Sequence, residues 1–218
     1  MLISLPRIFV AWVSFTSALI AAPEKWQPDI QKFLAADTAH PPQRDAVVFV
    51  GSSSIVKWKS LTEDFRGMSV VNRGFGGSEL ADSVEFADEI VIPYHPRAVV
   101  LYAGDNDIAA GKSAEAVLSD FRAFRSKVHA GVPTARIYYL SIKYSPSRAK
   151  FQSTMRQANS LIAADCASTD YCTFVDVNSP LLDAQGQPRP ELFEADQLHM
   201  KADTYALWVK VLKPLIQP

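Results

Sequence analysis

Five short apolar segments, separated by longer segments of helical spacing, most restrict what this 218-residue chain can fold into. Each segment is close to continuously apolar and rich in Val, Ile or Tyr, which is typical of strands buried on both faces of a sheet. Alternation of strands and helices within one domain predicts a parallel sheet covered by helices on both sides, an α/β fold. We expect helices at 114–128, around 155–162 and at 205–215, and strands at 46–50, 68–71, 98–103, 136–142 and 173–177.

The composition limits the number of domains and the kind of partner. With 48% hydrophobic residues the chain can build one sizeable core, and its length leaves little room for a second. The 22 basic and 23 acidic residues nearly cancel, so the excess of positive charge that nucleic-acid binders use is missing. We expect a single domain over residues 23–218 that acts on a small molecule and does not bind nucleic acid.

Residues 1–22 have the pattern of a secretory signal peptide. Arg7 supplies a positive charge, residues 8–22 are almost wholly apolar, and Ala21 and Ala22 end the segment with small side chains. The apolar run is shorter than the ~20 residues of a membrane-spanning helix, which favours cleavage. An uncleaved anchor and a buried first helix are the alternatives. We therefore expect a periplasmic or secreted protein with no membrane span after removal of the signal.

Export gives the two cysteines a structural meaning. Cys166 and Cys172 are six positions apart and are separated by residues typical of turns. An oxidising compartment favours a disulfide between them, and two free, half-buried thiols are the alternative. Neither has the company of His or Cys that a zinc site needs, so we predict no metal site here.

Polar and glycine-rich segments follow the predicted strands and should meet at one edge of the sheet, because open parallel sheets place their ligand site at the carboxyl ends of the strands. A serine hydroxyl at the strand-to-helix turn after the first strand can act as a nucleophile, His199 can accept its proton, and Asp196 can orient the imidazole. The backbone N–H of that serine, a backbone N–H of the glycine-rich turn after the second strand and the side-chain amide of Asn106 can hold an oxyanion. The segments concerned are 50–54, 72–78, 104–107 and 196–199.

These four segments, in this order, resemble the sequence blocks of the SGNH/GDSL hydrolase family, and the resemblance extends from about residue 45 to residue 215. It implies Ser53 as the nucleophile, Gly77 and Asn106 as oxyanion-hole residues, and Asp196 and His199 as the rest of the triad. The implied fold is a three-layer α/β/α sandwich whose five parallel strands have the flavodoxin-like order 2-1-3-4-5. The implied activity is hydrolysis of carboxylic esters without a metal or an organic cofactor.

The chain departs from the family pattern at two positions. Ser52 replaces the acidic residue that normally precedes the nucleophile, and Gln197 stands where a glycine usually follows the catalytic aspartate. Ser52, Ser53 and Ser54 are adjacent hydroxyls, and alignment on Gly51 favours Ser53. A structural role as a helix N-cap is the alternative for Ser53.

Residues 106–113 end in Gly111, Lys112 and Ser113 and are one residue short of a phosphate-binding loop. The first glycine of that motif is missing, so nucleotide binding is not expected. Asp105 and Asp107 are interpreted as cap and turn residues and not as metal ligands.

The substrate is left open by the sequence. Carbohydrate O-deacetylation, lysophospholipid cleavage and hydrolysis of short esters or thioesters would use the same groups. Trp58, Phe75 and Tyr144 are candidates for an acyl pocket and equally for the core or the rim. A catalytically inactive domain that binds periplasmic glycans is the alternative from another functional class.

Overall fold

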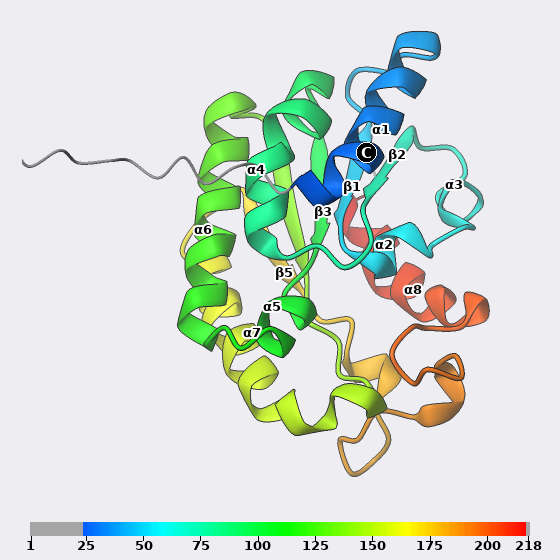
Figure 1. Cartoon of the computed structure of the whole chain (residues 1–218), viewed down its shortest axis with the longest axis vertical. Helices are drawn as coiled ribbons and strands as arrows, with labels where there is room; N and C mark the ends of the chain where they lie inside the picture. Colours follow the sequence, from blue (N-terminus) through cyan, green and yellow to red (C-terminus); the bar gives the residue numbers. More distant parts are fainter. Residues whose placement is uncertain (1–23, 217–218) are drawn as a thin grey trace, which may run out of the picture.

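The computed structural model describes residues 24–216, so the predicted signal peptide lies outside the described residues. Five parallel strands form one sheet in the order β2-β1-β3-β4-β5 (Figure 1). This order confirms the predicted α/β sandwich and its arrangement of strands. The strands are β1 (Val47–Gly51), β2 (Val70–Gly74), β3 (Ala98–Tyr102), β4 (Arg136–Leu140) and β5 (Cys172–Val175).

Helices cover both faces of the sheet (Figure 1). One layer contains α1 (Gln27–Ala39), α4 (Leu80–Ile90), α6 (Ala114–Gly131) and α7 (Gln152–Cys166). The opposite layer contains α2 (Ser53–Val56), α3 (Leu61–Asp64) and α8 (Tyr205–Ile216), and the short α5 (Asp105–Ala109) follows β3. The 3-10 helices are η1 (Glu24–Trp26), η2 (Ile92–Tyr94), η3 (Pro146–Phe151), η4 (Ser179–Leu181), η5 (Pro190–Leu192) and η6 (Ala202–Thr204).

The period of two along β1 explains why its sequence is continuously apolar. Val48 and Val50 pack into the core beneath α4 and α6, whereas Val47 and Phe49 pack into the core beneath α8. All five residues of the strand are buried. Because successive side chains point to opposite faces and both faces are covered, no position in the strand remains for a polar residue.

The second strand differs from its prediction: it runs from Val70 to Gly74 and not over 68–71. The sequence did not predict the second half of this edge strand because its residues are polar. In the fold these polar side chains have hydrogen-bond and ion-pair partners. Asn72 donates its side-chain amide to the carbonyl of Ile55 at 2.8 Å. The buried Arg73 bonds to the hydroxyl of Tyr94 at 2.8 Å and pairs with Asp37.

Helix α4 was not predicted from the sequence. Its apolar positions Leu80, Phe86 and Ile90 have helical spacing, but acidic residues interrupt them and the first turn lacks a Ser or Thr cap. Glu79 instead forms the capping box with Asp82, whose carboxylate accepts the N–H of Glu79 at 2.8 Å.

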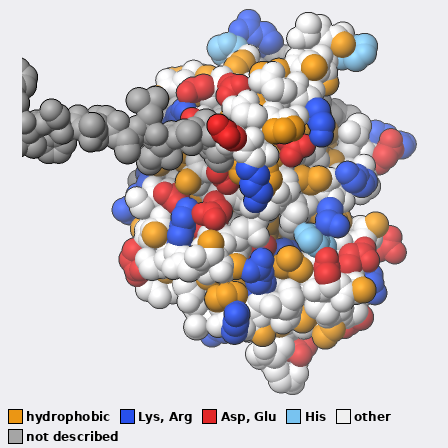
Figure 2. Space-filling view, in the orientation of Figure 1, with side chains coloured by type: hydrophobic (Ala, Val, Ile, Leu, Met, Phe, Trp, Pro, Cys, Tyr) orange, Lys and Arg blue, Asp and Glu red, His pale blue; other side chains and the backbone are white. Residues whose placement is uncertain are grey.

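The two cysteines are joined in the structure. Cys166 ends α7 and Cys172 begins β5, and their Cα atoms are 4.9 Å apart. Over residues 24–216, no helix is long and apolar enough to span a bilayer. On the face shown in Figure 2, acidic and basic side chains are interspersed, in keeping with the near balance of charges in the sequence.

Candidate active site

Ser53 lies two positions after the last residue of β1, at the first position of α2. The turn before it requires glycine: Gly51 has φ of +131°, and a Cβ there would lie 1.9 Å from the carbonyl oxygen of Tyr102 on β3. The backbone N–H of Ser53 belongs to the first turn of the helix, where no carbonyl of the same helix can accept it. The turn thus presents the Ser53 hydroxyl and its own N–H at the carboxyl edge of the sheet.

The three adjacent serines have different environments. Ser52 and Ser54 are buried, at 0% and 1% exposure, and their hydroxyls have no hydrogen-bond partner. Ser53 is partly exposed, and its Oγ lies 3.0 Å from Nε2 of His199. Among the three, Ser53 is therefore the hydroxyl that contacts an imidazole and can be reached by a substrate.

The Asp196 carboxylate holds the far side of the His199 ring. Its Oδ2 lies 2.6 Å from Nδ1 of His199, and its Oδ1 accepts the backbone N–H groups of Leu198 and His199, each at 2.9 Å. The bond to the His199 side chain, followed by these two backbone bonds, holds the pKa of Asp196 well below its usual range. A charged carboxylate favours a proton on Nδ1, which leaves the lone pair of Nε2 facing Ser53.

Gln197, which stands where the sequence pattern led us to expect a glycine, has a left-handed backbone conformation. Its φ of 55° lies in the left-handed region, which costs a residue with a side chain roughly 1–2 kcal/mol. Its backbone N–H and its side-chain amide both donate to the carbonyl of Glu194, at 2.9 and 3.1 Å. The N–H of Glu194 in turn donates to the carbonyl of His199 at 2.7 Å. These bonds offset the strain and keep the turn that presents the imidazole.

The two other candidate oxyanion residues lie on neighbouring segments. Gly77, with φ of +82°, is exposed in the loop between β2 and α4, and a Cβ on the adjacent Gly76 would lie 4.0 Å from that of Ser53. Asn106, in α5, donates its Nδ2 to the carbonyl of Ser78 at 3.1 Å. One of its two amide protons is thereby engaged, and the other remains for a ligand.

The structure thus brings the loop of Gly77 beside Ser53, ties Asn106 to that loop, and places His199 and Asp196 in line with the serine hydroxyl. Nucleophile, base, orienting acid and backbone donors gathered at one edge can perform acyl transfer.

Two of the three aromatic residues considered for an acyl pocket are buried in the hydrophobic cores. Trp58 and Phe75 are each 1% exposed and belong to the two cores. Trp58 donates its indole N–H to Asp64 at 2.7 Å, and Phe75 packs edge-on against Trp26. Tyr144 borders a cavity formed after β4 and β5 together with Phe174, Asn159, Asp176 and Arg156. Trp58 and Phe75 are therefore core residues.

A buried polar cluster behind the site had no counterpart in the sequence analysis. Lys143, which follows β4, is completely buried, and its Nζ lies 3.1 Å from the hydroxyl of Tyr102 and 3.2 Å from the carboxylate of Asp105. Burial raises the pKa of Tyr102 well above its usual range, so this phenol remains neutral. Asp105 directly precedes Asn106, so the ion pair anchors the first turn of α5. The only signal in the sequence is a lysine close after an apolar strand.

Among the described residues, no three His, Cys, Asp or Glu side chains are grouped so that they would hold a metal ion.

Solved structures of known proteins share this fold. A protein from Streptococcus pneumonia that carries the name platelet activating factor superposes with a TM-score of 0.77 at 23% identity, over 88% of this chain and 94% of its own. A GDSL-like lipase from Bacteroides thetaiotaomicron gives a TM-score of 0.72 at 18% identity, over 86% and 97% of the two chains. A catalytic mutant of an acetylxylan esterase from Geobacillus stearothermophilus gives 0.60 at 16%, over 79% and 94%. At these identities the likeness concerns the fold alone.

Sequence comparison supplies the family. No curated protein matches the chain. The model of the GDSL-like Lipase/Acylhydrolase family matches residues 50–207, which extend from the end of β1 into α8 and include Ser53, Gly77, Asn106, Asp196 and His199. With this match over most of its length, the chain belongs to the GDSL-like lipase/acylhydrolase family.

Proposed function

We propose that this protein is a serine esterase in which Ser53 is the nucleophile, His199 the general base and Asp196 the residue that orients the histidine. The observation that carries the proposal is the continuous line of contacts from Ser53 Oγ to His199 Nε2, at 3.0 Å, and from His199 Nδ1 to Asp196 Oδ2, at 2.6 Å. Family membership supports the same reaction class, hydrolysis of esters.

In the first half of the reaction, Ser53 Oγ attacks the ester carbonyl carbon while His199 Nε2 takes the hydroxyl proton. The carbonyl oxygen becomes an oxyanion, which accepts hydrogen bonds from the N–H groups of Ser53 and Gly77 and from the free amide proton of Asn106. The bond to the alcohol then breaks, and the proton on His199 passes to the leaving oxygen. An acyl group remains on Ser53.

In the second half, a water molecule attacks the acyl carbon, and His199 takes one of its protons. Collapse of the second tetrahedral intermediate breaks the bond to Ser53 Oγ, which recovers its proton from His199. The acid is released and the enzyme is restored. The charged Asp196 stabilises the imidazolium that forms twice in each cycle, and the reaction uses no cofactor.

The test compares the native protein with Ser53→Ala in hydrolysis of p-nitrophenyl esters from acetate to palmitate, beside acetylated sugars. We expect turnover by the native protein, and none above background by the variant, with an unchanged melting temperature. Ser52→Ala is the matched control, since its buried hydroxyl belongs to the N-cap residue immediately before Ser53, and it is expected to keep most of the activity.

A fluorophosphonate probe distinguishes the esterase from an inactive glycan-binding domain, because only an activated serine is labelled. Labelling of the native protein that is lost in Ser53→Ala supports the proposal. An unlabelled native protein that binds glycans and hydrolyses none of the esters would overturn it.

We further propose that residues 1–22 direct export and that the domain works in the periplasm or outside the cell. The apolar segment with its small-residue end and the Cys166–Cys172 pair support this location. Cell fractionation followed by N-terminal sequencing tests it: a mature chain that begins near residue 22 is expected, and an intact cytoplasmic chain would contradict it.

A further inference from the structure

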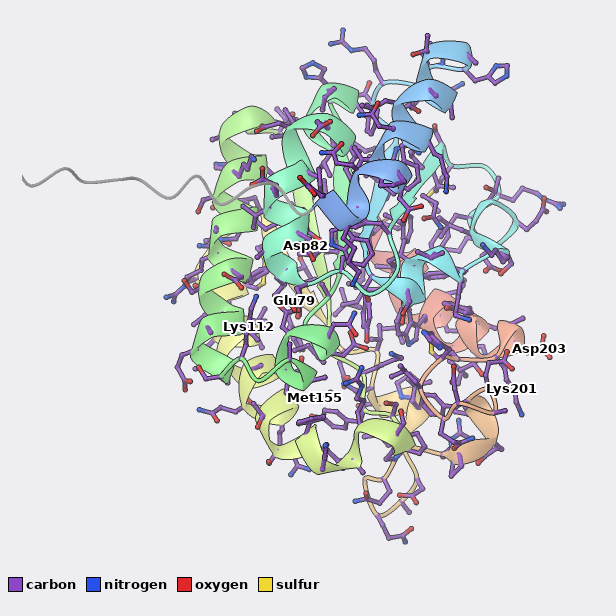
Figure 3. The ribbon with its side chains drawn as sticks, in the orientation of Figure 1. Glu79, Asp82, Lys112, Met155, Lys201 and Asp203 are labelled. Atoms are coloured by element: carbon purple, nitrogen blue, oxygen red, sulfur yellow. A yellow bond between two sulfur atoms is a disulfide. The ribbon has the colours of Figure 1, made fainter. Side chains whose placement is uncertain are left out.

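The Gly111-Lys112-Ser113 segment, which resembles the end of a phosphate-binding loop, lies between α5 and α6. Here the lysine binds carboxylates of the chain itself. Its Nζ lies 2.7 Å from Asp120, 2.9 Å from Glu79 and 3.1 Å from Asp107. Figure 3 shows Glu79 at the start of α4, with Lys112 near it and Asp82 on the first turn of the helix.

Two of these carboxylates are neighbours of the candidate oxyanion donors. Glu79 is two residues after Gly77, and Asp107 is the residue after Asn106. Lys112 therefore connects the loop between β2 and α4 to helix α5 from outside. Its side chain is 27% exposed, so solvent reaches this ion-pair cluster.

Two further bonds join the same segments. The fully buried carboxylate of Asp107 accepts the N–H of Leu80 at 3.0 Å, and Asn106 Nδ2 donates to the carbonyl of Ser78 at 3.1 Å. Both bonds depend on the distance between the loop and α5. Without the ammonium of Lys112, the carboxylates of Glu79 and Asp107 would repel each other across this junction, and the buried Asp107 would lose its cationic partner.

We propose that Lys112 is a positioning residue that fixes the loop of Gly77 against the helix of Asn106 and so sets the spacing of the two oxyanion donors. The inference rests on the proposed esterase function. Lys112 itself touches neither the substrate nor the reacting atoms, and it acts through Glu79 and Asp107. A displacement of about 1 Å at such donors lowers turnover by up to about 10²-fold.

The test is Lys112→Met, which keeps most of the side-chain volume and removes the charge. Lys127→Met is the matched control, because Lys127 also joins two helices of this layer, with Nζ 2.8 Å from Asp88 and 2.8 Å from the carbonyl of Val84. On p-nitrophenyl acetate we expect kcat to fall about 10- to 100-fold in Lys112→Met with KM changed less than threefold. In Lys127→Met both constants should stay within twofold of the native values.

A second readout does not need activity. In nitrogen-15 NMR spectra of the full folded domain, Lys112→Met should shift or broaden the amide signals of Gly77 and of the Asn106 side chain, and Lys127→Met should leave them in place. If the native protein hydrolyses no ester, the proposed function fails while these signals still decide the inference on Lys112.

Equal kcat values for the two lysine variants, or unmoved Gly77 and Asn106 signals in Lys112→Met, would overturn the inference and leave Lys112 a link that only stabilises the fold. If Lys112→Met does not fold, Glu79→Gln replaces it, since the amide removes the charge and can still cap α4. A kcat lowered at least threefold, with shifted Gly77 signals, supports the inference in that variant, and native values for both overturn it.

Discussion

Asp196→Asn should nearly abolish activity while hardly changing stability. In the native structure one carboxylate oxygen accepts two backbone N–H groups, from Leu198 and His199, and the other faces Nδ1 of the His199 ring at 2.6 Å. An asparagine has one acceptor oxygen. If that oxygen keeps the two backbone donors, the NH₂ group faces Nδ1, which must then be an acceptor.

The proton of the imidazole consequently moves to Nε2, where it points at Ser53 Oγ, 3.0 Å away. The ring can no longer take the serine proton. Rotating the asparagine amide by 180° would not restore the native tautomer at low cost, because its NH₂ group would then face two backbone N–H donors. We expect kcat/KM to fall about 10³- to 10⁴-fold, as for other triads with the wrong tautomer, which corresponds to roughly 4–5.5 kcal/mol in the activation barrier.

The change in stability should be small by comparison. The Asp196 side chain is 48% exposed, and exposed ion pairs contribute about 0–1 kcal/mol. For a domain of this size that corresponds to a shift of at most about 4 °C in Tm. Asp203→Asn is the matched control: Asp203 is an exposed acid on the same C-terminal segment (Figure 3), and its replacement should leave kcat/KM within twofold.

The assay is p-nitrophenyl acetate hydrolysis from pH 7 to 9, with Ser53→Ala as background, beside thermal unfolding followed by circular dichroism. Retention of more than a tenth of the native kcat/KM in Asp196→Asn would refute the argument that the carboxylate selects the tautomer. A drop in Tm of 10 °C or more would show that the loss of activity reflects unfolding.

Three other changes test the site and its frame. Asn106→Ala should lower kcat about 10²- to 10³-fold, and a loss under fivefold would make the amide structural. Gly51→Ala forces a Cβ within 1.9 Å of the Tyr102 carbonyl oxygen, so circular dichroism should show a largely unfolded chain; a native-like Tm contradicts this. Burial raises the folded-state pKa of Asp107 to about 6, so stability linked to its neutral form disappears as the pH rises. Lys112→Met should raise the pKa of Asp107 further, because the cation is lost. The loss in free energy of unfolding relative to the native protein, measured in urea, should therefore be larger at pH 8 than at pH 5. An equal loss at the two pH values would refute this coupling.

The class of fold could be predicted because the apolar pattern of each strand is visible in the sequence without knowledge of its tertiary contacts. Strands such as β1 and β3 are apolar at every position since helices cover both faces of the sheet, and this pattern is visible in the sequence. The edge strand β2 lacks this continuously apolar pattern. In the sequence, Arg73 indicates a loop, because its partners Asp37 and Tyr94 become its neighbours only in the folded protein.

Block order indicated the candidate site residues, whereas the sequence left open whether Trp58 and Phe75 line a pocket or belong to the core. Ser52, Ser53 and Ser54 differ little as letters, yet only the path of the chain after Gly51 exposes the middle hydroxyl. Trp58 and Phe75 follow the strands as pocket residues would, and the packing of helices over the sheet buries both.

By itself, then, the sequence determined the alternation of strands and helices and the family, and it supplied the candidates for nucleophile and base. The contact between Ser53 and His199, 146 positions apart, and the convergence of Glu79, Asp107 and Asp120 on Lys112 were decided by tertiary structure. The physical reason is that periodicity and capping act over a few residues, whereas hydrogen bonds and ion pairs depend on distances that exist only after the layers have packed.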